Sequence, residues 1–323
     1  MKDFDARFRD FPDYILGITK EIWEDRGLDT LHRYYAPDIV VRAPAGMVTG
    51  NDGVIAATMA TLHEFPDRQL LGEDVIWCEC PETGGMLSSH RIVSLATHAA
   101  GGIYGPATGR QLSYRIIAQC HARANVIDDE WLIRDQGAIV RQLGHDPAEY
   151  ARDLIAREGG PEGAARPFTP AIDRPGPYAG RGNDNVWGAR YADILTRIMA
   201  AEFSAIPAEY DRACHLEHPG GVTAHGHGAA DRFWMGLRAS FPDAALTLHH
   251  VVGMKEAGMP PRAAILFSLD GKHAGWGSFG APTGAHVHVM AAAHAEFGPR
   301  GLRREWVLHD ETAIWKQIHL ATG

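Results

Sequence analysis

The sequence predicts an α+β protein built from two similar cone-shaped domains, in each of which helices pack on one face of a curved antiparallel sheet. Two observations support this prediction: the chain repeats itself once, and each copy has three helical segments followed by several segments with strand-like polarity. Elements in this order form a layer of helices on a layer of sheet. The space between the two layers is a natural place for a small ligand.

The internal repeat is indicated by several short sequence segments that recur after the same number of residues. Tyr-Gly-Pro-Ala-Thr-Gly at residues 104–109 returns as Phe-Gly-Ala-Pro-Thr-Gly at residues 279–284, 175 positions later. The same offset relates Glu-Trp-Leu-Ile-Arg-Asp at residues 130–135 to Glu-Trp-Val-Leu-His-Asp at residues 305–310. Because composition alone does not produce such matches, we interpret the chain as a tandem duplication.

Both copies are expected to contain the same elements in the same order. Apolar residues at helical spacing predict three helices per copy, at residues 15–25, 31–35 and 54–63 and at residues 191–203, 209–214 and 229–240. Alternating or apolar segments between turns predict four strands per copy, at residues 74–80, 87–97, 111–122 and 131–141 and at residues 246–253, 263–269, 285–296 and 305–317. The domains are therefore expected at residues 1–145 and 186–323, joined by a short helix and a Gly/Pro-rich linker at residues 146–185.

Composition is that of an ordinary globular protein. Of the 323 residues, 45% are hydrophobic and 22% are charged, and the formal net charge of −9 disfavours nucleic acid and anionic membranes as partners. No apolar stretch approaches the ~20 residues of a membrane helix, and the charged N-terminal segment has no signal-peptide pattern, so a cytoplasmic protein is expected. The cysteines are too few for a disulfide framework and are expected to be buried thiols: Cys78, Cys80, Cys120 and Cys214.

Four motifs of the first copy carry a resemblance to a known family. They are Thr-His at residues 97–98, Gly-Pro-Ala-Thr-Gly at 105–109, Trp-Leu-Ile-Arg-Asp at 131–135 and Arg-Gln-Leu-Gly at 141–144. On these motifs each copy resembles the NTF2-like (cystatin-like) superfamily, and more narrowly the SnoaL-like polyketide cyclase family. The second copy lacks the Gln-Leu-Gly ending. The resemblance therefore implies the same fold in both copies, and a cyclase-type site more in the first copy than in the second.

Asp135 is the first candidate for a catalytic residue. On a strand, Trp131, Ile133 and Asp135 would point to one face, and apolar neighbours would favour the neutral carboxyl group that general acid–base catalysis needs. The resemblance implies the same role, because Asp135 matches the acid–base residue of the family. Asp310 holds the equivalent position beside Trp306. The alternative is that each carboxylate only caps or pairs at the end of a strand.

Two histidines form a second candidate pair. His98 and His273 occupy matching positions and are expected near the carboxylates, where they would shuttle a proton or hydrogen-bond a substrate oxygen; the alternative is a structural histidine at a strand end. Weaker candidates for substrate binding are aromatic or cationic: Trp131, Tyr104, Tyr114, Arg115, Trp306 and Trp276. Their alternative roles are turn packing, core filling and surface positions.

Metals and cofactors are not expected. The chain has 18 histidines, with close pairs at residues 225 and 227, 249 and 250, and 286 and 288, but no glutamate follows at the spacing of a metal site. The sequence also has no dinucleotide-binding Gly motif after a strand, no P-loop and no nucleophile elbow.

Three functional hypotheses follow. The first is a cofactor-independent lyase or isomerase that acts on a small carbonyl-containing molecule by Asp/His acid–base catalysis, in aldol-type cyclisation, dehydration or isomerisation. The second is a non-catalytic small-molecule-binding or scaffold protein. In the third, one copy is active and the other is its packing partner. The two copies are expected to pair through their sheets as an internal pseudo-dimer, which leaves a further homo-oligomer open.

Overall fold

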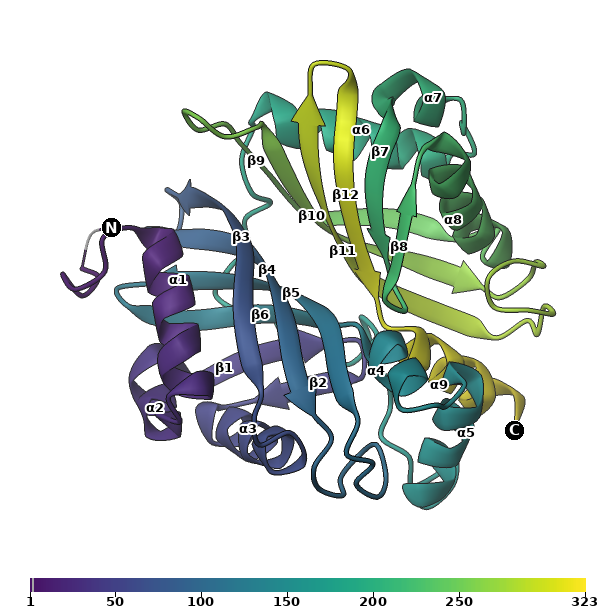
Figure 1. Cartoon of the computed structure of the whole chain (residues 1–323), viewed down its shortest axis with the longest axis horizontal. Helices are drawn as coiled ribbons and strands as arrows, with labels where there is room; N and C mark the ends of the chain where they lie inside the picture. The colour runs from purple at the N-terminus through teal and green to yellow at the C-terminus, as the bar shows by residue number, and fades with distance from the viewer. Residues whose placement is uncertain (2) are drawn as a thin grey trace.

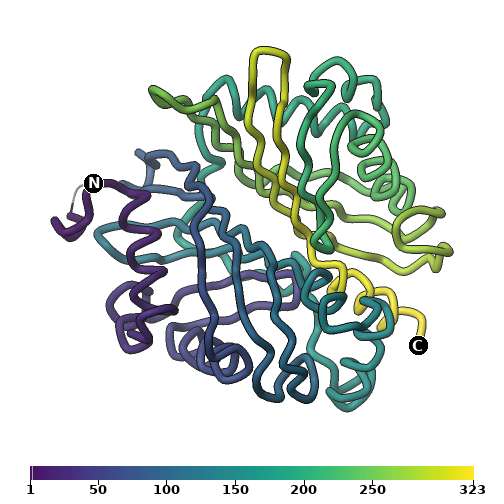
Figure 2. Tube along the Cα trace, viewed as in Figure 1, coloured from purple at the N-terminus to yellow at the C-terminus, as the bar shows by residue number. Residues whose placement is uncertain are grey.

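The computed structural model describes residues 1 and 3–323 and confirms the predicted α+β class. Two domains of similar architecture follow each other along the chain, and each has a six-stranded curved sheet with helices on one face (Figure 1). The N-terminal and C-terminal halves of the chain lie side by side as two bodies (Figure 2). None of the helices in the described part of the chain combines the length and the apolar character of a membrane span.

In the described residues, the first domain contains six helical elements and six strands, and the connector contains one further helix. The helical elements are α1 (Phe11–Thr19), the π-helical segment η1 (Lys20–Glu24), the 3₁₀ turn η2 (Leu28–Thr30), α2 (Leu31–Tyr34), α3 (Asn51–Glu64), α4 (Gln136–Gln142) and, in the connector, α5 (Pro147–Arg157). The strands are β1 (Tyr35–Ala43), β2 (Gly46–Thr49), β3 (Gln69–Cys80), β4 (Gly85–Thr97), β5 (Gln111–Arg123) and β6 (Val126–Arg134). They form a sheet in the order β2-β1-β6-β5-β4-β3.

The second domain repeats this arrangement. Its helices are α6 (Val186–Met199), α7 (Ala205–Glu209), α8 (His227–Ser240) and α9 (Glu311–Thr322). Its strands are β7 (Tyr210–His218), β8 (Val222–His225), β9 (Ala245–Met254), β10 (Arg262–Lys272), β11 (His286–Gly298) and β12 (Gly301–His309). The order β8-β7-β12-β11-β10-β9 matches that of the first sheet, strand for strand.

Side-chain caps explain where several helices begin. The carboxylate of Asp10 accepts a hydrogen bond from the Asp13 backbone N–H at the start of α1, and Asp146 accepts from the first turn of α5, which has Pro147 at its first position. Asn185 caps α6 in the same way. Such caps satisfy backbone N–H groups that have no partner inside the helix.

The first two strands of each sheet differ from the sequence-based prediction. Residues 35–49 form β1 and β2, and residues 210–225 form β7 and β8, although the second predicted helix of the second copy covered residues 209–214. β1 pairs in parallel with β6, and β7 with β12, so each sheet is mixed and not purely antiparallel. Four consecutive residues of β1 are buried. A strand buried on both faces has no alternation of polarity, which explains why it was missed.

The last predicted strand of each copy is also shorter than expected. β6 ends at Arg134 and is followed by the helix α4, and β12 ends at His309 and is followed by the helix α9. Asp135 and Asp310 are the N-caps of these helices: Asp135 accepts from the Ala138 backbone N–H, and Asp310 accepts from the backbone of the first turn of α9. The predicted capping alternative therefore describes the local structure at both positions.

The two sheets pack on each other through the faces that their helices leave uncovered. Apolar side chains from both domains meet there: Ile76, Cys78, Leu87, Ile117 and Ile133 from the first sheet and Val252, Ala264, Leu266, Met290 and Leu308 from the second. Polar pairs also cross this interface, including Ser89 Oγ with His294 Nε2 at 2.7 Å and His250 Nδ1 with Gln119 Oε1 at 2.7 Å. At one end of the interface α5 packs against α9 (Figure 1). This is the internal pair that the duplication predicts.

Candidate active site

The first domain has a cavity of about 170 Å³ between its helices and the concave face of its sheet. Most of its lining is apolar: Ile15, Ile18, Trp23, Val41, Val54, Ile92, Ile116, Ala118 and Leu132. Trp23 comes from the π-helical segment η1 and packs edge-on against Tyr35, with ring centroids 6.4 Å apart. An apolar cavity of ~150 Å³ is large enough to take up benzene, so this space suits a small ring system.

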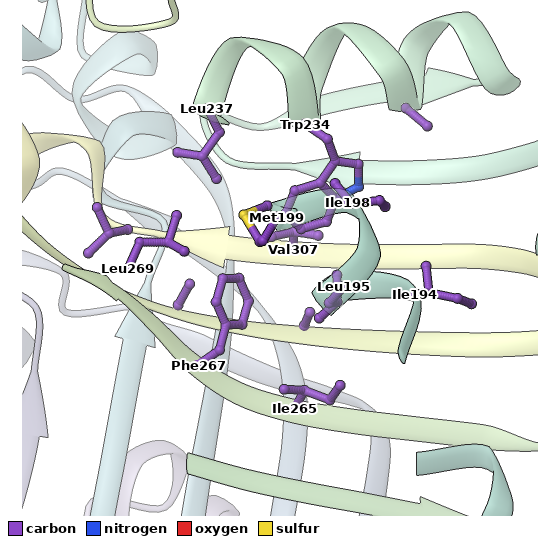
Figure 3. Packing of buried hydrophobic residues seen from close by; sticks show 14 of the residues in the cluster. Ile194, Leu195, Ile198, Met199, Trp234, Leu237, Ile265, Phe267, Leu269 and Val307 are labelled. Carbon is purple, nitrogen blue, oxygen red and sulfur yellow. The ribbon is translucent and has the colours of Figure 1, made fainter. Parts of the chain in front are cut away.

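The second domain fills the corresponding space with large side chains (Figure 3). Around the third helix the offset between the copies is 176, because Phe-Pro-Asp at residues 65–67 returns at residues 241–243. Trp234 of α8, which is fully buried, therefore corresponds to Thr58 of α3. On the sheet, Phe267 of β10 corresponds to Ile92 of β4. Larger residues at these positions extend into the volume that the first domain leaves open. The difference in side-chain size therefore explains why the first domain has a cavity where the second has a packed core.

Glu130 of β6 is a buried carboxyl group on the cavity wall. Burial raises its pKa to about 7, although the neighbouring Tyr35 hydroxyl group, as a hydrogen-bond donor to the carboxylate, acts in the opposite direction. A carboxyl group with a pKa near neutrality can both accept and release a proton at physiological pH. Such a group in a largely apolar cavity is a typical feature of an acid–base site.

The equivalent carboxyl group in the second domain has more partners. Glu305 accepts hydrogen bonds from the hydroxyl groups of Tyr191, at 2.9 Å, and Tyr210, at 2.6 Å. Tyr210 corresponds to Tyr35, but the position of Tyr191 is occupied by Ile15 in the first domain. Glu130 therefore has one tyrosine donor where Glu305 has two, and its carboxyl group faces the cavity with spare hydrogen-bonding capacity.

His90 of β4 contributes a second titratable group to the cavity. Its Nδ1 lies 3.3 Å from the Ser88 hydroxyl oxygen, and burial lowers its pKa to about 4. The imidazole is therefore neutral at physiological pH and can donate one hydrogen bond while it accepts another.

Two arginines and a tyrosine occupy one end of the cavity. Arg68, directly after the turn that ends α3 at residues 65–67, and Arg134, at the end of β6, both line it. The Tyr114 hydroxyl group lies close to both guanidinium groups, which lower the pKa of the tyrosine. In strand register Arg134 is next to Ile116 and Tyr114 is next to Ser94, so these groups come from adjacent strands on the concave face.

The structure places Asp135 outside this cavity, so its predicted position in the cone is wrong. Trp131, Ile133 and Asp135 do share a face, but it is the face that packs on the second domain. The Asp135 carboxylate accepts hydrogen bonds from the backbone N–H groups of Gly220 and Gly221, at 2.9 and 3.0 Å. Burial raises its pKa to about 6. Asp135 thus ties the turn between β7 and β8 to the start of α4.

Asp310 has the equivalent capping role in the second domain. Its Oδ1 accepts from the Thr312 and Ala313 backbone N–H groups, at 2.8 and 3.1 Å, and from the Thr312 hydroxyl group. Burial raises its pKa to about 6. The expectation that it lines a cone of its own is not met, because large apolar side chains fill the second domain at that place.

The two predicted histidines hold turns in place. His98 Nδ1 lies 3.0 Å from the Thr108 hydroxyl oxygen, and its Nε2 lies 3.1 Å from Glu64 Oε1. His273 Nδ1 makes the same contact with Thr283, at 3.1 Å. Neither histidine lines the first-domain cavity. The structural alternative therefore accounts for their matching positions.

The predicted substrate-binding residues lie mostly elsewhere. Trp131 packs against His250 and Trp306 stacks under Arg91, both at the interface between the sheets. The Tyr104 hydroxyl group donates to Gln136, Arg115 pairs with Glu73 and with Glu217 of the second domain, and Trp276 is 75% exposed. Tyr114 lies beside the polar end of the cavity, where the Tyr104 hydroxyl group also lies close to Arg134.

A second hollow lies between the domains. It has a volume of about 500 Å³, and its polar lining includes Arg115, Asp135, Arg141, Gln142 and Glu217. The charged members already pair with one another or with neighbours: Arg115 with Glu217 at 3.3 Å, and Arg141 with Glu311. Asp135 is likewise satisfied by backbone donors. We therefore take the apolar cavity, whose polar groups have free hydrogen-bonding capacity, as the candidate active site.

The histidine pairs and the cysteines form no metal cluster in the part of the chain that the structure describes. His286 and His288 both contact Asp270, at 3.1 and 2.9 Å, and His250 bonds to Gln119. All four cysteines are buried and free of disulfide bonds.

Four cavity residues were not predicted as site residues: Arg68, His90, Glu130 and Arg134. The alternation of β6 offered a signal, because Glu130, Leu132 and Arg134 must face the side opposite to Trp131 and Ile133. The sequence could not decide which side is the cavity, since both faces of the sheet are buried.

Comparisons with known proteins match part of the chain. Residues 14–143 match the family model described as SnoaL-like polyketide cyclase. Similar solved structures include IdmH, a putative polyketide cyclase from Streptomyces antibioticus (26% identity, 41% of this chain and 97% of that chain, TM-score 0.36), and a putative polyketide cyclase from Acidithiobacillus ferrooxidans (19%, 41%, 92%, 0.36). A third is AclR, a putative hydroxylase from Streptomyces galilaeus (16%, 41%, 82%, 0.33). No curated protein matches the chain. The match to the SnoaL-like polyketide cyclase model thus covers the first domain, and the second domain has the same strand order as the first.

Proposed function

We propose that the first domain is a cofactor-independent enzyme that transfers a proton beside a carbonyl group of a small, largely apolar molecule, in a reaction of the cyclisation or isomerisation type. The observation that carries this proposal is Glu130, a buried carboxyl group with spare hydrogen-bonding capacity on the wall of an apolar cavity. The family match of residues 14–143 supports the same class of reaction.

In this mechanism Glu130 is the general base and then the general acid. Its carboxylate removes a proton from the carbon next to the carbonyl group, and the resulting carboxyl group returns the proton at another carbon or at oxygen. The Tyr35 hydroxyl group stabilises the carboxylate form. The raised pKa keeps both protonation states accessible near neutral pH.

His90 would stabilise the enolate that forms. A neutral imidazole can donate a hydrogen bond to the substrate oxygen as negative charge develops there. The low pKa of His90 keeps it in this neutral form. The second domain, with its filled core, would support the first through the sheet interface and bind no substrate.

The test uses proton exchange, because it needs no knowledge of the natural substrate. A panel of small cyclic and aryl ketones in D₂O is followed by proton NMR for enzyme-dependent loss of the hydrogen next to the carbonyl group. We expect Glu130→Gln to lower this rate at least 100-fold, the scale on which a general base contributes. Glu305→Gln is the matched control, since it makes the same change in the second domain, and it should leave the rate within about twofold.

Two results would contradict the proposal. One is an unchanged rate in Glu130→Gln, and the other is an equal loss in both variants. A wild-type protein that binds members of the panel but exchanges none of them would instead favour the non-catalytic binding hypothesis.

A further inference from the structure

The polar end of the cavity has an excess of positive charge with no carboxylate to balance it. Among the described residues, the hydrogen bond of Arg68 Nε to Ser94 Oγ, at 3.2 Å, is the side-chain bond that holds this guanidinium group, and Arg134 Nε has no partner at all. Neither guanidinium group forms an ion pair with a carboxylate of residues 1 and 3–323. The Tyr114 hydroxyl group beside them also has no hydrogen-bond partner.

Asp310 of the second domain acts on Arg134 electrostatically without forming an ion pair with it. Its Oδ1 is already occupied by the first turn of α9. Arg68 is buried and Arg134 is half-buried. Two such neighbouring cations repel each other and lose hydration, and both effects destabilise a fold unless an anion compensates them. A ligand with an anionic group would compensate the charge of both arginines, which explains why the two lie together without a carboxylate.

The duplication supplies an independent comparison. At the four matching positions of the second domain, Arg68 becomes Ala244, Ser94 becomes Leu269, Tyr114 becomes Val289 and Arg134 becomes His309. The copy whose core is filled thus lacks both arginines and the tyrosine, while it keeps the glutamate, as Glu305. The positive cluster accompanies the cavity and is not needed for the fold.

The cluster and Glu130 lie at different ends of the cavity. Glu130 and Arg134 are four positions apart along β6, which corresponds to about 13 Å between their Cα atoms at the usual rise of a strand. The wall between them is apolar, with Leu132, Ile116 and Ala118. A ligand that uses both ends has an anionic group, an apolar body, and the reacting part near Glu130.

We propose that the first-domain cavity binds organic carboxylates, with the carboxylate group held between Arg68 and Arg134 and with the Tyr114 hydroxyl group as an additional donor. A planar carboxylate accepts paired hydrogen bonds from a guanidinium group, which makes arginine the preferred residue for this recognition. This inference rests on the proposed function for the location of the reacting end, but the anion site itself does not depend on turnover.

Binding of two matched probes tests the proposal. 4-Phenylbutanoate and its neutral amide, 4-phenylbutanamide, have nearly the same shape and differ in charge. Calorimetric titration of the full chain should show that the carboxylate binds at least tenfold more tightly than the amide. Arg68→Met and Arg134→Met, which keep an apolar side chain of similar length, should each abolish this preference. Arg115→Met, outside the cavity, is the matched control and should retain it.

Two further measurements keep the outcomes distinct. Without ligand, Arg68→Met and Arg134→Met should raise the midpoint of thermal unfolding, because each removes a cation that no carboxylate pairs. The carboxylate should stabilise the wild type but not these variants. Glu130→Gln should keep the preference for the carboxylate, so loss of proton exchange in that variant tests the proposed function alone. No binding of the carboxylate, equal affinity for both probes, or an intact preference in both arginine variants would overturn the proposal.

Discussion

The two domains show how one fold can carry a binding cavity or a packed core. Both have the same strand order, and both keep the pair formed by a buried glutamate and a tyrosine, as Glu130 with Tyr35 and as Glu305 with Tyr210. They differ in the side chains above the sheet, where Thr58 of the first domain corresponds to Trp234 of the second. The comparison teaches that the fold preserves the glutamate, whereas the size of its neighbours decides whether a ligand can reach it.

The largest effect is expected when the large side chain that fills the core of the second domain is removed. Trp234→Ala should lower the free energy of unfolding by about 3–5 kcal/mol, because it deletes a fully buried indole and leaves a cavity. Thr58→Ala at the matching position should cost less than about 1 kcal/mol, since that side chain already borders an open space. Urea unfolding measures both values. Similar losses in the two variants would show that the two cores do not differ as described.

The pH dependence of stability should also differ between the domains. Burial raises the pKa of Glu305 to about 7, so between pH ~4.5 and 7 the folded state holds a proton that the unfolded state has released. The free energy of unfolding therefore falls as the pH rises through this window, by about 3 kcal/mol for this group. Glu305→Gln does not titrate and should flatten the curve measured by urea unfolding from pH 4.5 to 8.

Glu130→Gln should flatten the curve in the same direction but by less. Burial raises the pKa of Glu130 to about 7 as well, yet water that enters the cavity can hydrate its carboxylate. Stability that rises with pH in this window, or a larger change in Glu130→Gln than in Glu305→Gln, would contradict the assignment of the open and filled cores.

A tryptophan at the matching position of the first domain should abolish ligand binding in the cavity. Thr58→Trp places the indole of the second core in the cavity, so the affinity for 4-phenylbutanoate should fall at least 100-fold, which is about 2.7 kcal/mol. The midpoint of thermal unfolding and the circular dichroism spectrum show whether the variant is folded. A folded variant that binds with unchanged affinity would place the ligand site outside the cavity.

The smallest effect is expected at the interface between the domains. Asp135→Asn replaces one carboxylate oxygen by an amide donor opposite the N–H groups of Gly220, Gly221 and Ala138, and should lower stability by about 1–3 kcal/mol. Proton exchange by the folded variant should stay within about twofold of the wild type, because Asp135 does not line the cavity. A 100-fold loss of exchange with retained stability would return Asp135 to the role of acid–base residue.

The sequence was sufficient for the duplication, the class of fold and the third helix of each copy. It was not sufficient for β1, because a strand segment buried on both faces carries no alternating pattern. It also placed the start of β7 in a helix, although the later residues of β7 alternate between buried and half-buried positions. For the site, the strand that carries Glu130 and leads to Asp135 was recognised, but the face of this strand that borders the cavity was not. Both faces of β6 are buried, one by the helices of its own domain and one by the second domain, and a pattern of local polarity does not distinguish these environments.

The residues missed at the site share a second reason. Arg68 follows a turn and Arg134 ends a strand, and in sequence such positions are typical of exposed charge. Their burial results from packing between segments that lie far apart in the chain, since α3, β4, β5 and β6 all border the same cavity. The sequence segments that recur in both copies include Asp135, His98 and their counterparts, and these residues were therefore predicted to form the site. In the structure they make the contacts of helix caps and turns.

A crystal structure of the full chain with bound 4-phenylbutanoate tests the central claim most directly, namely that ligand binding belongs to the open core of the first domain. The account predicts electron density between α3 and the concave face of the first sheet, with the carboxylate group at Arg68 and Arg134 and the phenyl ring directed toward Glu130. Density for the ligand in the hollow beside Asp135 and Glu217, or inside the second domain, would contradict it.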